Sequence, residues 1–166
     1  MRGPVRRGFV LAGGRSRRFG SDKAMAELDG APAVVALVRR MAAAGLEAGV
    51  VWRTSRPELG LLEVIEPEGE LHHPLLGLAA IEGEDELFVC PCDAITLAPD
   101  MIRRLVDARA VATDSPLCGV WPAEVRQQAL VWAREGRSVQ ALAVDLARLD
   151  VGSIGNRNLP TLAPST

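Results

Sequence analysis

The residues with the clearest chemical potential lie in one loop near the start of the chain. The loop reads LAGGRSRRFGSDK over residues 11–23 and directly follows a predicted strand at residues 5–11. Paired glycines let the backbone approach a ligand closely and turn successive N–H groups toward an anion, while arginine and lysine add fixed positive charge. The loop therefore predicts a triphosphate site cradled by Gly13 and Gly14.

Spacing rules out two common phosphate motifs in this loop. The sequence has no GxGxxG of a dinucleotide site, and the stretch from Gly14 to Lys23 does not fit the GxxxxGK[ST] of a P-loop. A phosphate site in this loop must therefore be of another kind. On composition alone, a tight turn with solvated arginines remains an equal alternative.

A second chemical candidate is Asp93, in the segment FVCPCD at residues 88–93. This aspartate follows a predicted strand at residues 86–90, and ligands bind at the carboxyl ends of strands in open α/β sheets. Mg2+ prefers oxygen ligands and commonly takes one or two carboxylates together with substrate phosphates. Asp93 is thus a candidate magnesium ligand, although spacing alone favours a turn or helix-capping aspartate before Pro99.

The charge distribution indicates what kind of ligand the chain binds. The net charge is −2, but residues 1–23 carry six arginines and Lys23 against the single acid Asp22, and residues 24–166 carry 12 bases and 20 acids. A basic start on an acidic body favours one compact anionic ligand. A nucleic-acid track would need a basic stripe with aromatic platforms, and aromatic residues are only 4%. We expect no nucleic-acid partner.

Composition also predicts the compartment. The longest apolar stretch, at residues 74–81, is far shorter than the ~20 residues of a spanning helix, so we expect a cytoplasmic protein without a membrane partner. Cys90, Cys92 and Cys118 are odd in number and form no CxxC pair. They indicate reduced thiols with a structural role rather than a disulfide frame or zinc site.

Strands and helices alternate along the sequence. Strands are predicted at residues 5–11, 50–53, 62–66, 86–90, 117–121 and 151–154, and helices at 32–44, 75–82, 99–108, 122–135 and 138–149. This alternation predicts an α/β fold with a mostly parallel sheet covered on both faces. We expect one domain over residues 1–162 with a flexible tail at 163–166, because no linker or repeat divides the chain.

The loop at residues 11–23 resembles LAGGxSxRMGxDK, the loop of the molybdenum cofactor guanylyltransferases within the wider nucleotidyltransferases. Every specified position matches except the methionine, which is Phe19 here. The resemblance extends over nearly the whole chain and is strong at residues 9–23 and 86–93. It implies a single three-layer Rossmann-like nucleotidyltransferase domain.

The resemblance also implies which residues act. The implied nucleotide-binding residues are Leu11, Ala12, Gly13, Gly14, Lys23, Pro74, Leu75, Gly77 and Asp93, and the implied catalytic residues are Arg18, Lys23 and Asp93. In this family an aspartate in a nearly identical CPCD segment binds Mg2+, which reverses the preference for a turn at Asp93. Gly13 and Gly14 would wrap the phosphates, while Arg18 and Lys23 would neutralise charge as pyrophosphate leaves.

Two further segments resemble the family. HPLLG at residues 73–77 stands where relatives have GPLAG, a loop around the guanine edge, and the alternative for His72 and His73 is a solvated pair. Asn156 and Asn158, followed by Leu-Pro, resemble the NVNTP segment on the acceptor side. A polar turn near the terminus is the alternative there.

The match fails at two positions that contact the nucleoside in relatives. Thr54 stands where the family has asparagine, and Pro67 stands where it has aspartate. Losing an acid near the ribose weakens nucleotide binding unless Glu66 or Glu68 substitutes for it.

By resemblance, the predicted reaction transfers GMP from GTP to the phosphate of molybdenum-molybdopterin, giving the guanine dinucleotide cofactor and pyrophosphate, with Mg2+ as cofactor. The expected partners are GTP, the molybdopterin cofactor and a molybdoenzyme or its chaperone, and the expected state is a monomer. Two alternatives stay open. One is a related nucleotidyltransferase that uses CTP or another phosphate acceptor, although Gly13-Gly14 favours GTP; the other is a non-catalytic nucleotide-binding module.

Overall fold

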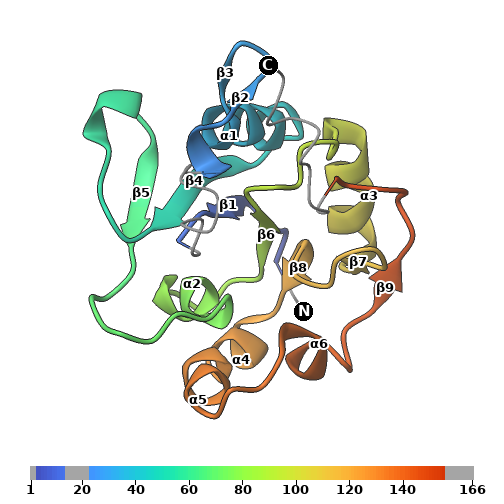
Figure 1. The fold of residues 1–166 in the computed structure, drawn as a ribbon. Helices are drawn as coiled ribbons and strands as arrows, with labels where there is room; N and C mark the ends of the chain where they lie inside the picture. Colours follow the sequence, from blue (N-terminus) through green and yellow to red (C-terminus); the bar gives the residue numbers. More distant parts are fainter. Residues whose placement is uncertain (1–2, 14–22, 156–166) are drawn as a thin grey trace.

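A seven-stranded sheet forms the centre of the protein in the computed structural model, which describes residues 3–13 and 23–155 (Figure 1). The strand order is β5-β4-β1-β6-β8-β7-β9. The strands are β1 (Arg7–Leu11), β4 (Glu47–Trp52), β5 (Leu62–Ile65), β6 (Leu87–Pro91), β7 (Val111–Ala112), β8 (Gly119–Trp121) and β9 (Arg148–Leu149). Strands β5, β4, β1 and β6 are parallel, β8 is antiparallel to β6 and β7, and β9 is parallel to β7.

Helices cover both faces of this sheet. They are α1 (Ala33–Ala43), α2 (Leu75–Ala80), α3 (Pro99–Ala108), α4 (Ala123–Arg126), α5 (Ala129–Arg134) and α6 (Val139–Leu142), with short 3-10 helices η2 (Lys23–Met25) and η3 (Pro57–Leu59). Figure 1 shows α1 and α3 on one side of the sheet and α2, α4, α5 and α6 on the other. Among the described helices, none combines the length and apolar character that a membrane-spanning helix needs.

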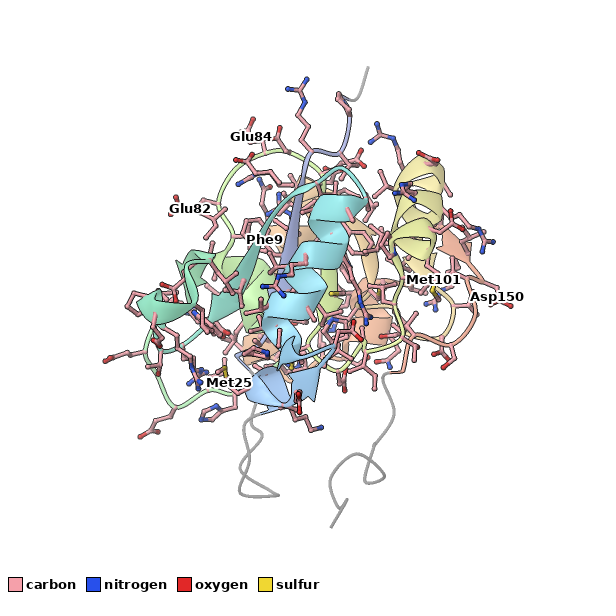
Figure 2. All side chains as sticks on the ribbon, turned by 90° about the horizontal axis from the view of Figure 1, so that it is seen from above. Phe9, Met25, Glu82, Glu84, Met101 and Asp150 are labelled. Atoms are coloured by element: carbon pink, nitrogen blue, oxygen red, sulfur yellow. The ribbon has the colours of Figure 1, made fainter. Side chains whose placement is uncertain are left out.

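The core lies on both faces because successive side chains of a strand point in opposite directions. In β1, Val10 packs with α1 and α3, whereas Phe9 and Leu11 pack with α2 and α5. Figure 2 shows Phe9 in the interior, with Glu82 and Glu84 at the periphery. The predicted three-layer α/β fold with a mostly parallel sheet is confirmed.

Local signals explain where the well-predicted elements begin and end. Helix α1 stops before Gly45, whose φ of 96° lies in the left-handed region that glycine adopts without strain. Helix α3 begins at Pro99, because proline has no N–H to leave unpaired in the first turn.

A small hairpin near the start of α1 was not predicted. It joins β2 (Glu27–Leu28) to β3 (Ala31–Pro32) through Asp29 and Gly30, whose φ angles are 56° and 79°. Positive φ at both central residues is the type I′ arrangement that Asp-Gly favours, so the dipeptide was an available signal.

The C-terminal third departs most from the prediction. The predicted helix at residues 138–149 is only the four residues of α6, and the edge strand is β9 rather than residues 151–154. The strand prediction at residues 151–154 was wrong because this segment packs against the protein without pairing with a strand of the sheet. Ile154 is buried there, and its N–H donates to Asp114 at 3.4 Å while its carbonyl accepts from Thr96 at 3.1 Å. The predicted helix at 122–135 is divided into α4 and α5.

Candidate active site

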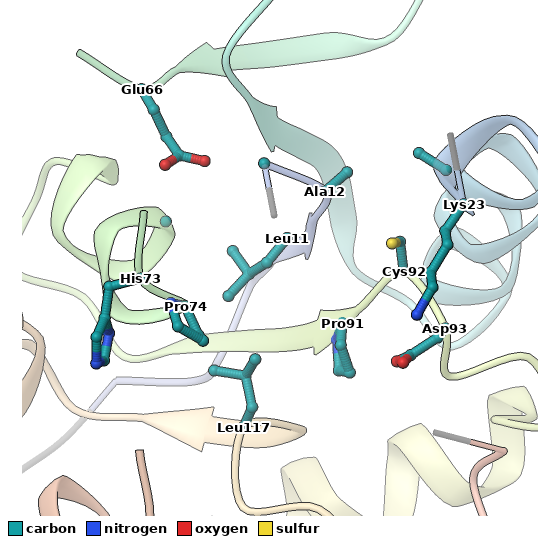
Figure 3. A pocket seen from close by; sticks show the side chains of 13 residues that line it. Leu11, Ala12, Lys23, Glu66, His73, Pro74, Pro91, Cys92, Asp93 and Leu117 are labelled. Carbon is teal, nitrogen blue, oxygen red and sulfur yellow. The ribbon is translucent and has the colours of Figure 1, made fainter. Parts of the chain in front are cut away.

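A pocket of about 240 Å3 lies where the carboxyl ends of β1 and β6 meet (Figure 3). It is lined by Leu11, Ala12, Gly13, Lys23, Ala24, Glu66, His73, Pro74, Gly77, Pro91, Cys92, Asp93 and Leu117. This is the edge of a parallel sheet at which α/β proteins bind ligands. The pocket brings together residues that lie far apart in the sequence.

Backbone hydrogen bonds hold the end of β1 at the mouth of the pocket. The N–H of Ala12 donates to the carbonyl of Val51 at 2.8 Å, and the N–H of Cys92 donates to the carbonyl of Leu11 at 3.3 Å. Both neighbouring strands therefore continue to pair with the chain up to the glycine loop. The backbone is thus held by hydrogen bonds on both sides immediately before Gly13.

One end of the pocket carries Asp93 and Lys23. Figure 3 shows the Lys23 side chain running toward the carboxylate of Asp93. Burial raises the pKa of Asp93 above its ordinary value, while the charge of Lys23 acts in the opposite direction. A partly buried carboxylate beside a lysine can bind a cation and a phosphate group next to each other.

Arg40, on α1, holds the loop that follows Asp93. Its Nη1 donates to the carbonyls of Ile95 at 2.7 Å and Leu97 at 3.0 Å, and its Nη2 contacts Asp29 Oδ2 at 2.7 Å. Arg40 was not predicted as a site residue, since nothing in the spacing of an arginine on a helix indicates which carbonyls it contacts. Arg40 therefore couples α1 to the conformation of the loop.

The same loop also anchors the chain just before the predicted acceptor segment. Thr96 Oγ1 donates to the carbonyl of Ser153 at 2.8 Å, and Thr96 N–H donates to the carbonyl of Ile154 at 3.1 Å. A Cβ atom on Gly155 would lie 2.9 Å from Ile95 Cγ1, so only glycine fits against the loop there. Residues 153–155 thus lie against the segment that carries Asp93.

The other end of the pocket carries Glu66, which follows β5 (Figure 3). Glu66 is only 5% exposed, and burial raises the pKa of its carboxyl group despite the charge of Arg53. Arg53 Nε lies 3.9 Å from Glu66 Oε1. A buried acid in a ligand pocket is a candidate functional group. From the sequence, Glu66 was expected only as a substitute for the missing aspartate.

The segment HPLLG lies at the same end of the pocket as Glu66 (Figure 3). His73 Nδ1 accepts a hydrogen bond from the N–H of Leu75 at 3.1 Å, which starts α2. His73, Pro74 and Gly77 line the pocket, whereas Leu75 is fully buried in the core beneath it. His73 therefore has a structural contact within the pocket wall that the sequence did not indicate.

The cysteines near the site are not arranged as nucleophiles. Cys90 and Cys118 are fully buried, and burial raises the pKa of both thiols, which keeps them neutral. Cys92 lines the pocket next to Asp93, and none of the three forms a disulfide. The geometry supports the predicted structural role.

The predicted site residues divide into three groups. Leu11, Ala12, Gly13, Lys23, Pro74, Gly77 and Asp93 line one pocket; Leu75 lies beneath it; Gly14, Arg18, Asn156 and Asn158 fall outside the described residues. The geometry brings the first group together from three predicted segments. Their roles in binding and catalysis stay predictions.

The donor set around Asp93 fits one kind of metal site. No group of three or more histidine, cysteine or acidic side chains among the described residues is arranged to enclose a metal ion. Mg2+ does not need such a cage, since it is often held by one or two carboxylates and completed by water and substrate phosphates. Asp93 at the end of β6 fits that mode of binding.

Comparison with known proteins identifies the family. Residues 8–156 match the MobA-like NTP transferase domain. The chain belongs to this family. Membership of the MobA-like NTP transferases confirms the predicted nucleotidyltransferase class, and the glycine loop, Lys23 and Asp93 all lie within the matched region.

Relatives with curated names support the same family. A molybdenum cofactor guanylyltransferase of Cereibacter sphaeroides is 31% identical over 147 residues, covering 79% of this chain and 76% of the relative. A protein of the same name from Xanthomonas euvesicatoria pv. vesicatoria is 34% identical over 151 residues, covering 81% of this chain and 76% of the relative. The resemblance seen in the sequence is thereby confirmed.

Solved structures of other proteins share the fold. The molybdopterin-guanine dinucleotide biosynthesis protein A of Archaeoglobus fulgidus superposes with a TM-score of 0.65 at 13% identity, covering 87% of this chain and 82% of that chain. The 2-C-methyl-D-erythritol 4-phosphate cytidylyltransferase of Thermus thermophilus gives 0.62 at 15% identity, covering 95% and 96%. These identities establish a common architecture rather than a common substrate.

Proposed function

We propose that this MobA-like chain transfers GMP from GTP to the phosphate of molybdenum-molybdopterin, giving the guanine dinucleotide cofactor and pyrophosphate. The observation that carries the proposal is the pocket that joins Gly13, Lys23 and Asp93 at the carboxyl ends of β1 and β6. The names of relatives that are 31% and 34% identical support the choice of nucleotide and acceptor.

The pocket suggests how the substrates lie. Lys23 and Asp93 stand at one end and suit the triphosphate, while Glu66, Pro74 and Gly77 stand at the other and suit the nucleoside (Figure 3). The acceptor would approach from the side of residues 153–155, which lie against the Asp93 loop. Asn156 and Asn158 follow directly in the sequence.

The reaction needs little covalent help from the protein. An oxygen of the acceptor phosphate attacks the α-phosphorus of GTP, the bond from that phosphorus to the bridging oxygen breaks, and pyrophosphate leaves. Positioning and charge neutralisation supply most of the catalysis in such transfers. Lys23 would neutralise the leaving pyrophosphate, with Arg18 as its proposed partner.

Asp93 would hold the Mg2+ ion that we propose for this site. When bound, Mg2+ neutralises phosphate charge and orients the phosphate oxygens. Within the protein, the part of Asp93 is to keep an ionised oxygen at the end of β6. Lys23 favours that ionised form against the opposing effect of burial.

The test is a pyrophosphate-release assay with GTP, molybdenum-molybdopterin and Mg2+, with mass spectrometry of the product. We expect the guanine dinucleotide and stoichiometric pyrophosphate from the wild type and neither from Asp93→Ala. Asp107→Ala, an exposed aspartate on α3, is the matched control and should remain active. Full activity of Asp93→Ala would contradict the assigned role.

The same assay separates the alternatives. Release with CTP in place of GTP, or with another phosphate acceptor, would indicate a related nucleotidyltransferase. Nucleotide binding without any release would indicate a non-catalytic module. The cytoplasmic location, the monomeric state and transfer of the product to a molybdoenzyme or its chaperone stay predictions from the sequence.

A further inference from the structure

Glu66 is a buried acid whose side chain faces a ligand pocket. Its carboxylate points into the pocket from the end of β5 (Figure 3). The N–H of Glu66 donates to the carbonyl of Trp52 at 2.9 Å, which continues the pairing of β5 with β4 and holds the backbone in place. The position of the carboxylate is therefore set by the sheet.

The partners of this carboxylate are few. Within residues 3–13 and 23–155, no donor lies within hydrogen-bonding distance of its oxygens, and the nearest cation is Arg53 Nε at 3.9 Å. The other nitrogens of Arg53 donate to the carbonyls of Gly69 and Leu71. Burying a carboxylate without donors is costly, so a ligand that supplies N–H groups would be favoured here.

The location of Glu66 restricts which part of a nucleotide it can meet. Lys23 and Asp93 occupy the opposite end of the pocket (Figure 3). A carboxylate repels phosphate groups, and the lysine end attracts them. The nucleoside rather than the triphosphate should therefore face Glu66.

We propose that Glu66 is a specificity-determining residue that accepts hydrogen bonds from the N1–H and the 2-amino group of guanine. This inference rests on the proposed function and adds the group that selects the base. Guanine presents two adjacent donors on one edge, which match the two oxygens of a carboxylate. Adenine N1 and cytosine N3 carry lone pairs instead, which a carboxylate repels.

The matched ligand for testing this geometry is ITP, because hypoxanthine keeps N1–H and lacks the 2-amino group. Loss of one hydrogen bond to a buried charged group should weaken binding roughly 10- to 100-fold. We therefore expect calorimetric titration of the wild type with Mg2+ present to rank the affinities GTP above ITP and ITP above ATP.

The decisive comparison uses Glu66→Gln. A glutamine presents an NH2 group in place of one oxygen and removes the negative charge from the other, so the hydrogen bonds from both guanine donors are lost or weakened. Both the GTP affinity and the GTP-to-ITP ratio should therefore fall. Glu68→Gln removes the same charge two residues away, at an exposed position, and should keep the wild-type ratio. Thermal unfolding of both variants verifies that they are folded.

The outcomes separate this inference from the proposed function. A wild-type GTP-to-ITP ratio that Glu66→Gln leaves unchanged would overturn the inference while guanylyl transfer still stands. A ratio that changes in Glu68→Gln instead would also overturn it, by moving the contact to Glu68. If the wild type binds no GTP at all, the proposed function itself fails.

Discussion

A Cβ atom on Gly13 would lie 2.7 Å from the Cδ atom of Glu66, closer than real Cβ contacts come. The two residues belong to different segments, one after β1 and the other after β5, and they meet at the wall of the pocket. Glycine at position 13 therefore has a second role besides the predicted close approach of the backbone to phosphate. It leaves room for the carboxylate of Glu66.

Replacing Gly13 with alanine should displace Glu66. Overpacking of this kind costs about 1–3 kcal/mol in the free energy of unfolding, and GTP affinity should fall with it. Chemical denaturation and calorimetry measure the two effects. Gly69→Ala is the control, because a Cβ there meets nothing within 4 Å and its φ is not in the left-handed region. Equal effects of both substitutions would contradict the proposed steric relationship.

Glu66→Gln should stabilise the ligand-free protein at neutral pH. Burial raises the pKa of Glu66 above its ordinary value of 4.5, so its contribution to stability is present below that value and is lost as the pH rises through the pKa in the folded state. The neutral glutamine avoids that loss. Thermal melts should show a higher Tm for the variant at pH 7 and a difference that shrinks below about pH 4. A lower Tm at pH 7 would contradict this reasoning.

Arg40→Ala should loosen the loop that carries Asp93. The variant loses hydrogen bonds to Ile95 and Leu97, at about 1 kcal/mol each. Because the proposed metal ligand precedes these carbonyls, turnover should require a higher Mg2+ concentration, while GTP affinity without metal changes little. Arg39→Ala, its exposed neighbour, is the matched control.

Measuring the Mg2+ dependence of turnover shows whether Arg40 positions the Asp93 loop or only stabilises the fold. If Arg40→Ala lowers Tm but leaves the Mg2+ concentration for half-maximal turnover unchanged, Arg40 is only structural. Arg40→Lys should recover little, since an ammonium group cannot reproduce the fork of a guanidinium.

Lys23 is the only lysine of the sequence, which permits a selective chemical test. If Lys23 contacts phosphate, GTP should slow its labelling by an amine-reactive reagent, and guanosine should not. Peptide mass spectrometry separates Lys23 from the terminal amine. Lys23→Ala should weaken GTP binding roughly 10-fold. Equal protection by guanosine would place the base, not the phosphates, beside Lys23.

The sequence predicted those parts of the fold that depend on neighbouring residues. Alternating strands and helices indicated the layered α/β architecture, and Gly45 and Pro99 marked helix ends through their own backbone preferences. Short elements such as β7 and β9 were not predicted, because two residues carry almost no periodic pattern. The strand prediction at residues 151–154 was wrong for the same reason, because a short apolar run fits either a strand or a packed extended segment.

By itself the sequence determined the family and the candidate phosphate and metal groups, because the glycine loop and Asp93 lie in contiguous motifs whose order carries the information. Only the tertiary structure decided that Glu66 faces Gly13 and that Arg40 holds the Asp93 loop. Those contacts follow from the strand order β5-β4-β1-β6 and from the packing of α1 on the sheet. The sheet brings together residues that are far apart along the chain, and no local sequence pattern indicates which of them come into contact.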